Sequence, residues 1–484
     1  MKKGFQVFLA VALVAAMAVP AMAETGINGF YRAKGFVSNF KAFGSGNHVN
    51  SSPADVAPAN SYVEQRLRLK FSVGEENVKA VAFFEQDMMW GDSSGQSGTR
   101  NAGGAIQGDS INIETKNIYL WFKVPDTGTD FTVGLQSVTD PYRGTFMGGA
   151  DMAGVVSIFK FEPLSFRVGG FTPWERTTNQ ADDTQLFIAE AKISPAKDLN
   201  VGVNFYFIRD GADVAGGISS GELPTTANVD AMFVAGATAA APAVSGVTKI
   251  YMPGVNFDYN AGVAKVSGFA FVQFGDRTYD DTAITKTKFG GYAADLRVDA
   301  NAGPAKVFLE GLYTSGDKPG TPDKIEGVVV AEDFKMQSSS SNSYGMDLQI
   351  LTLNGDDLNT ARGLIYSPNN NRVGGGYAMS GVRLGATLLA AGASMKLDDK
   401  TTAKVGAGYL RANQLAPAAL TGTNLNVSKS MGTEVNANVN YNILKGLDFG
   451  LYAAYAWLGD GYKVSGSPTP DNLYDAHVRL NYAF

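Results

Sequence analysis

Along most of the chain, apolar and polar residues alternate in segments of roughly ten residues, which is the period of a β-strand and not of a helix. Residues 62–73 show this most clearly, because Leu67 and Leu69 share one face while Arg66 and Arg68 share the other. A strand with leucines on one side and a row of cations on the other cannot lie inside a β-sandwich, where both sheets face a common apolar core.

Eighteen such segments follow one another, and the breaks between them are alternately short and long. Their approximate limits are 27–40, 61–73, 78–89, 112–124, 129–138, 152–161, 164–173, 184–194, 198–209, 248–259, 263–274, 287–300, 304–315, 383–397, 401–411, 432–443, 447–458 and 472–484. Short breaks such as 74–77 are rich in turn-forming residues, whereas the longest break covers 316–382. Tight turns on one rim and long loops on the other are typical of a membrane β-barrel.

This pattern predicts the fold class: an all-β, transmembrane antiparallel β-barrel of eighteen strands, with sixteen as the alternative, short periplasmic turns and long extracellular loops. A closed barrel pairs every backbone N–H and C=O group within the protein, as the bilayer requires. The alternative class is a soluble all-β protein such as a propeller or solenoid, but no internal repeat of fixed period is visible.

The first 23 residues have the pattern of a secretory signal peptide. Lys2 and Lys3 precede an apolar run that extends to Val19, and Ala21 and Ala23 form a small-residue cleavage signature. We therefore expect cleavage after Ala23 and a mature chain in which 24–484 form a single barrel domain. An uncleaved membrane anchor is the alternative.

Composition excludes several kinds of chemistry. The chain has no Cys and only two His, which excludes disulfides, thiolate zinc sites, iron–sulfur clusters and covalent haem attachment, so we expect no cofactor. Its formal charge of -6 argues against a nucleic-acid partner. Residues 217–221 match the Gly-x-Ser-x-Gly pattern of hydrolases but lie in a glycine-rich loop, without the strand, turn and helix that this motif needs, so we predict no enzyme.

Aromatic residues add two signals. Trp90, Trp174 and Trp457 each fall at the long-loop end of a predicted strand, where an aromatic belt would meet the outer headgroups. The last segment alternates to its end, with Tyr482 and Phe484 on its apolar face. This ending resembles the signal by which Gram-negative outer-membrane barrels are recognised for assembly.

Taken together, the signal peptide, the barrel pattern and the ending resemble the Gram-negative outer-membrane porin family, and the strand number resembles its 18-stranded substrate-channel group. The resemblance implies a place in the cell outer membrane, in contact with outer-membrane lipid, after insertion by the barrel assembly machinery. It implies a water-filled channel for passive diffusion of small hydrophilic solutes and ions. A homotrimer is one assembly that porins adopt, and the sequence does not decide between monomer and trimer.

The polar strand faces predict the pore lining, because a barrel of this size encloses water. The predicted pore-lining residues are Arg32, Lys34, Arg66, Arg68, Lys70, Glu85, Asp87, Asp295, Arg297, Asp299, Lys306, Glu310 and Arg479. Two interpretations stay open: these charges orient passing solutes through a transverse field, or they pair across strands and keep the lumen wet. His477, on the same face as Arg479, is interpreted as a polar group of the lumen.

The third long break, 137–152, corresponds by resemblance to the porin loop that folds inward and narrows the channel. Its constriction candidates are Asp140, Arg143 and Asp151, although the break is short for such a loop. Within the longest break, the apolar stretch 346–353 could enter the pore as a plug or remain at the surface.

Passive diffusion is the leading function, and two other classes remain. A barrel can sheathe a multihaem cytochrome partner, or it can act as a structural or adhesive surface protein. The chain has no Cys-x-x-Cys-His site and so cannot carry electrons itself. The sequence does not identify the solute, nor whether the loops bind calcium.

Overall fold

The computed structural model describes residues 24–39, 60–92, 104, 113–175, 182–211, 246–280, 286–318, 321, 323–331, 347–352, 384–415, 428–462 and 472–484. The expected signal peptide and the motif at 217–221 lie outside these residues. Within the described part, the regular elements are β-strands and one short 3-10 helix at Asp460–Tyr462. No helix in these ranges is long and apolar enough to cross a membrane.

Twenty-one strand segments make up the described sheet. They are β1 (Glu24–Ser38), β2 (Asn60–Glu75), β3 (Val78–Met89), β4 (Ile113–Val124), β5 (Thr129–Thr139), β6 (Gly148–Phe161), β7 (Leu164–Trp174), β8 (Thr184–Ala196), β9 (Leu199–Asp210), β10 (Gly246–Asn260), β11 (Ala264–Val272), β12 (Phe274–Tyr279), β13 (Thr287–Phe289), β14 (Tyr292–Ala302), β15 (Ala305–Thr314), β16 (Lys324–Ile325), β17 (Ala386–Lys396), β18 (Thr401–Ala412), β19 (Ser430–Leu444), β20 (Leu447–Leu458) and β21 (Leu473–Ala483).

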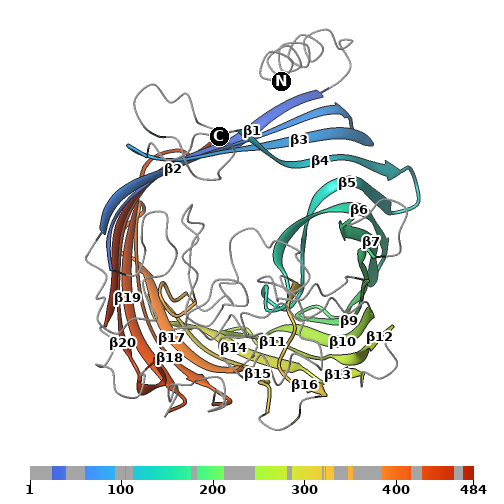
Figure 1. Cartoon of the computed structure of the whole chain (residues 1–484). Coiled ribbons are helices and arrows are strands. Elements are labelled where there is room, and N and C mark those ends of the chain that lie inside the picture. The colour runs from blue at the N-terminus through green and yellow to red at the C-terminus, as the bar shows by residue number, and fades with distance from the viewer. Residues whose placement is uncertain are drawn as a thin grey trace.

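These segments form a closed barrel of 18 antiparallel wall strands (Figure 1). β11 and β12 pair with successive parts of β10 and so form one wall strand, and β13 continues β14 in the same way. β16 is a short addition that runs parallel to β13. β1 pairs with β21, and Gly29 and Phe484 exchange two backbone hydrogen bonds of 3.0 Å. The predicted fold class and strand number are therefore confirmed, and the alternative of sixteen strands is excluded.

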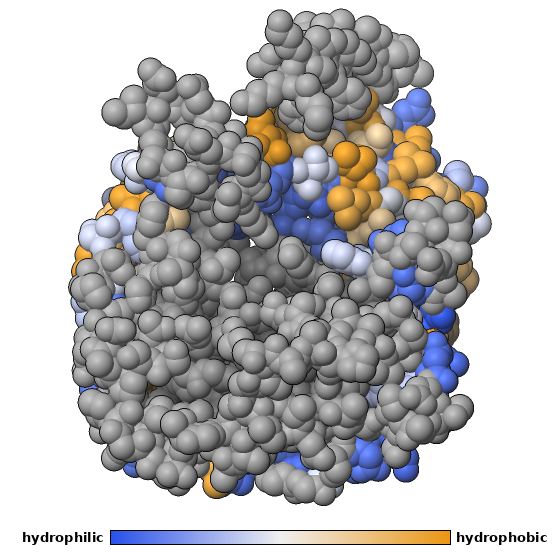
Figure 2. Space-filling model, in the orientation of Figure 1, coloured by the Kyte–Doolittle hydropathy of each residue, from blue (hydrophilic) through white to orange (hydrophobic). Residues whose placement is uncertain are grey.

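The outer face of the barrel carries exposed apolar side chains. Leu296, Leu309 and Val405 are more than half exposed on it, as a lipid-facing surface requires. Figure 2 shows hydrophilic residues where β1–β4 face the central opening and hydrophobic residues on the outer side of these strands. Trp90, Trp174 and Trp457 are exposed at the ends of β3, β7 and β20, as predicted for an outer aromatic belt.

The strand boundaries differ from the predicted ones mainly between β5 and β6. The predicted break 137–152 shrinks to residues 140–147, because β5 continues to Thr139 and β6 begins at Gly148. The added parts of β5 and β6 also alternate between apolar and polar residues. However, the end of this hairpin nearest its loop leaves the barrel wall. Ladder pairing between β4 and β5 stops at Ile118 and Leu135, and pairing between β6 and β7 stops at Gly154. We call residues 136–153 the arm, and its loop 140–147 the tip.

Candidate functional site

The inner faces of β1, β2, β3, β20 and β21 form what we call the charged wall. Arg66 of β2 donates from Nε and Nη2 to the two carboxylate oxygens of Asp87 on β3, at 2.7 Å each. Its Nε also lies 3.5 Å from Glu85 Oε2, and Arg68 forms an ion pair with the same Glu85. Cross-strand pairing therefore compensates two cations of the predicted basic column, as one of the two interpretations required.

Further charges lie on β1 and β21, on the side of β2 away from β3. In the strand register, Lys34 lies opposite Glu64 of β2 and Arg479 of β21, and Arg32 lies opposite Arg66. Arg479 donates to Asp448 Oδ2 at 2.9 Å. Lys70 lies nearer the short-turn rim, opposite Asn28 and Phe83.

A row of aromatic rings, which the sequence pattern did not predict, crosses the charged wall at one level. Tyr62, Phe36, His477 and Tyr452 are direct register partners on β2, β1, β21 and β20. Neighbouring ring centroids are 5.0, 4.9 and 4.5 Å apart. His477 also hydrogen-bonds Asp475 Oδ2 at 3.1 Å. The row can be recognised only once the strands are paired in register, because each strand contributes a single ring to it.

The tip is held by one carboxylate. Asp140 accepts hydrogen bonds from the backbone N–H groups of Tyr142, Gly144, Phe146 and Met147, at 2.8, 2.9, 2.8 and 2.6 Å. These contacts replace the strand pairing that the tip lacks. Burial raises the pKa of the Asp140 carboxyl to about 6, against the four N–H groups, which lower it.

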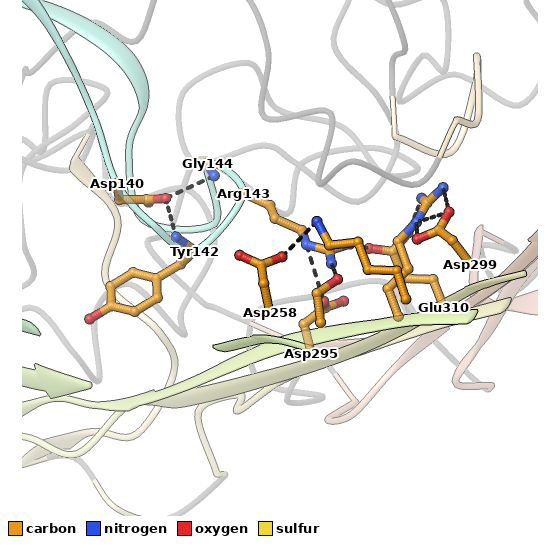
Figure 3. Close-up of polar contacts among 11 residues, drawn as sticks. Asp140, Tyr142, Arg143, Gly144, Asp258, Asp295, Asp299 and Glu310 are labelled. Atoms are coloured by element: carbon orange, nitrogen blue, oxygen red, sulfur yellow. Dashed lines mark hydrogen bonds and ion pairs between the residues drawn. The ribbon is translucent and has the colours of Figure 1, made fainter. Parts of the chain in front are cut away.

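The tip crosses the lumen to the wall formed by β11, β14 and β15 (Figure 3). Arg143 forms ion pairs with Glu310 and, at 3.5 Å, with Asp295, and it donates to Ser267 Oγ at 2.6 Å. Arg143 therefore joins the tip to this wall, and its role in narrowing the channel stays a prediction.

Arg297 extends this group of charges. It donates to both oxygens of Asp299 and to Glu310 Oε2 at 2.8 Å. The structure thus brings together five predicted residues: Arg143, Asp295, Arg297, Asp299 and Glu310. Lys306 is not among them, because it lies four residues along β15 from Glu310, which is about 13 Å on a strand.

Asp151 does not belong to the tip. It lies in β6, and its carboxylate oxygens accept from Lys116 Nζ and Asn117 Nδ2 of β4, at 2.9 Å each. Its assignment as a constriction-loop residue is corrected, because the strands extend further than the sequence pattern indicated.

Two parts of the longest predicted break lie against the inner wall. Gln273 bonds the backbone of Val329 in both directions, at 2.7 and 2.9 Å, and Ala331 N donates to Phe146 O of the tip. The buried carboxylate of Glu434 on β19 accepts from the N–H groups of Gln349, Ile350 and Leu351, at 2.7, 2.9 and 2.7 Å. The apolar stretch whose place was left open is therefore inserted over residues 347–352.

Inserted segments and arm together divide the lumen into two unlike parts. Between the arm and the inner faces of β8–β11, apolar side chains form a continuous buried cluster that includes Val138, Met152, Ile188, Tyr206, Ile250 and Phe269. Beside β1–β3 the described inner faces carry charged side chains instead, while the apolar cluster also reaches Ala454 of β20 and Leu473 of β21. Charged side chains suit water and hydrophilic solutes.

A closed antiparallel barrel of 18 strands is the fold of the 18-stranded outer-membrane porins. The outer membrane protein opdK from Pseudomonas aeruginosa matches with a TM-score of 0.52 at 10% identity, covering 95% of this chain and 99% of that chain. OccAB4 from Acinetobacter baumannii matches with a TM-score of 0.50 at 11% identity, covering 96% and 100%. No protein-family model and no curated protein matches the chain. The likeness therefore concerns the fold, over nearly the whole length of both chains.

Proposed function

We propose that this protein is an outer-membrane porin through which small hydrophilic solutes and ions diffuse passively. The observation that carries the proposal is the charged wall, which faces the lumen of a closed barrel whose outer face is apolar. A lumen of paired charges remains hydrated, and diffusion through it needs no moving part. The fold shared with opdK and OccAB4 supports the same proposal.

The charged wall carries nearly balanced charge. Its cations are Arg32, Lys34, Arg66, Arg68, Lys70, Lys79 and Arg479, and its carboxylates are Glu24, Glu64, Glu85, Asp87, Asp448 and Asp475. We propose that selectivity between cations and anions is weak, and that the charges mainly orient solutes on their way past the tip. No enzymatic role forms part of the proposal.

Single-channel recording in planar bilayers tests this function. A porin gives discrete ohmic steps in purified form. A sheath for a multihaem cytochrome, or a structural or adhesive barrel, conducts only if its lumen is open without a partner. Absence of steps from correctly folded, heat-modifiable protein would contradict the porin proposal.

Export and assembly belong to the same proposal. We propose that residues 1–23 are removed as a signal peptide, and that the barrel assembly machinery recognises the strand face ending in Tyr482 and Phe484. N-terminal sequencing of protein from outer-membrane fractions tests the cleavage site. Chemical cross-linking in native membranes distinguishes a monomer from a homotrimer.

A further inference from the structure

The barrel wall is interrupted where the arm leaves it. Above Leu135 and Gly154, β5 and β6 pair with each other but not with β4 or β7, although residues 113–117 of β4 and 172–174 of β7 are all described. Two strands are thus missing from the wall at this level. Three strand spacings, about 14 Å, separate β4 from β7 there if the wall keeps its curvature.

The departure of the arm is built into the sequence at one point. Gly134 and Gly154 are direct register partners at its base. Gly134 has φ +126°, and a Cβ at this position would come within 2.5 Å of Ile118 O. The side-chain amide of Gln136 donates to the carbonyls of Gly154 and Thr132, at 3.2 Å each, and so serves backbone groups where the strands part.

The polarity of the arm changes at the same point. Below the glycine pair, the outer face of this hairpin carries exposed Val133 and Val155. Above it, the same face carries Ser137, Thr139 and Asp151. A strand face that turns from valine to serine and aspartate no longer faces lipid. In Figure 1, β5 and β6 curve away from β4 into the lumen, as this change requires.

We propose that the interruption between β4 and β7 is a lateral portal, through which amphiphiles with a carboxylate head pass between the lumen and the hydrocarbon of the outer membrane. Only a molecule compatible with both water and hydrocarbon can use an opening that joins the two. Ile113 and Ile118 of β4 and Trp174 of β7 are exposed at the edges and offer an apolar contact for the tail.

The contact of Lys116 and Asn117 with Asp151, which we call the latch, identifies the head group. Lys116 and Asn117 donate to the two oxygens of one carboxylate, that of Asp151, at 2.9 Å each. The carboxylate of a solute can replace Asp151 on the same two donors, which opens the latch and binds the head in one exchange. A cationic or neutral head lacks this exchange.

Cysteine labelling tests the architecture, because the chain has no Cys of its own. Val133 and Ser137 lie on the same strand face, below and above the glycine pair respectively. Each is replaced by cysteine in a separate variant, Val133→Cys and Ser137→Cys. We expect a membrane-impermeant maleimide to label S137C in intact membranes and to leave V133C unlabelled within the lipid. Equal protection of both would show that the arm lies in the wall, and would overturn the portal.

Uptake of radiolabelled oleate tests the function, in a Gram-negative host without its own route for long-chain fatty acids. Asp151→Ala removes the competing carboxylate and should increase oleate uptake, whereas Lys116→Gln removes the main donor and should decrease it. Simple loss of an ion pair would move both variants in the same direction. The matched controls are Asp130→Ala and Lys160→Gln, which break a 3.2 Å ion pair below the glycine pair and should leave uptake unchanged.

Three results would overturn the proposal: no uptake above the empty host, equal shifts in both latch variants, or no shift in either. Ionic conductance of the same variants should stay at the wild-type value, since the latch lies beside the charged wall and not across it. If the wild-type protein shows no ionic conductance, the porin function is contradicted but the portal is not. The two proposals therefore fail on different measurements.

Discussion

The charged wall and the arm are built from the same alternation of polar and apolar residues, yet they place their side chains by different rules. In β1, β2 and β3, one face belongs to the apolar outer surface and the other belongs to the charged wall along the whole strand. In β5 and β6 this holds only up to the glycine pair. Above it, one face packs on the apolar cluster and the other faces the lumen. Alternation therefore assigns two faces, but what each face meets depends on whether the strand stays in the wall.

The largest effect is expected from removing the acceptor that holds the tip. Asp140→Ala leaves four backbone N–H groups without a partner, and unsatisfied buried donors cost about 1–3 kcal/mol each, so the tip should detach. Trypsin cleavage after Arg143 in folded protein measures this. Asp130→Ala, which loses one exposed ion pair worth about 0–1 kcal/mol, should remain resistant. A tip that stays equally resistant in D140A would contradict the account.

A smaller effect is expected at the wall opposite. Glu434→Ala removes the acceptor of three N–H groups, so residues 347–352 should leave their place against β19. Single-channel conductance should rise as the lumen widens. Asn436→Ala removes a 3.1 Å bond to Asp347 O and a 2.9 Å bond to Glu434 Oε1. It leaves the acceptor of the three N–H groups in place and should change the conductance much less. Equal conductance in E434A and wild type would mean that the inserted segment does not limit flow.

The charged wall should respond in selectivity and not in structure. Replacing Arg66, Arg68 and Lys70 with Gln removes three of its seven cations and should shift the reversal potential toward cation selectivity, most clearly at low ionic strength. A second variant that also carries Glu85→Gln and Asp87→Gln restores the balance and should return toward wild type. If the triple variant keeps its selectivity at low salt, the column serves only to keep the wall wet.

The smallest effect is a dependence on pH at the tip. The pKa of Asp140 is raised from 3.8 to about 6, so the folded tip binds a proton more tightly than the unfolded chain. The stabilisation from this group is complete below pH 3.8 and is lost as the pH rises through about 6. Asp140→Asn does not titrate, so the difference in trypsin resistance between wild type and D140N should shrink over this range. A difference that grows with pH would contradict the sign.

The number of strands and the faces of most of them could be predicted from sequence, because a bilayer imposes an unbroken alternation on every wall strand. Asp151 was misassigned because alternation continues in the arm after it leaves the wall. The signals for that departure, Gly134 with Gly154 and the change from Val133 to Ser137, acquire meaning only once β5 and β6 are paired in register. Glu434 gave no signal, since its three partners lie more than 80 residues away.

The hydrogen bonds between Gly29 and Phe484 join positions separated by almost the whole chain. Contacts of such high sequence separation are slow to form, because the entropy of closing the ring is lost before the contact contributes. One edge of β1 therefore has no partner strand until β21 pairs with it. An unpaired edge is prone to aggregation, so a partner that holds the final strand would both shield the chain and set the moment at which the ring closes.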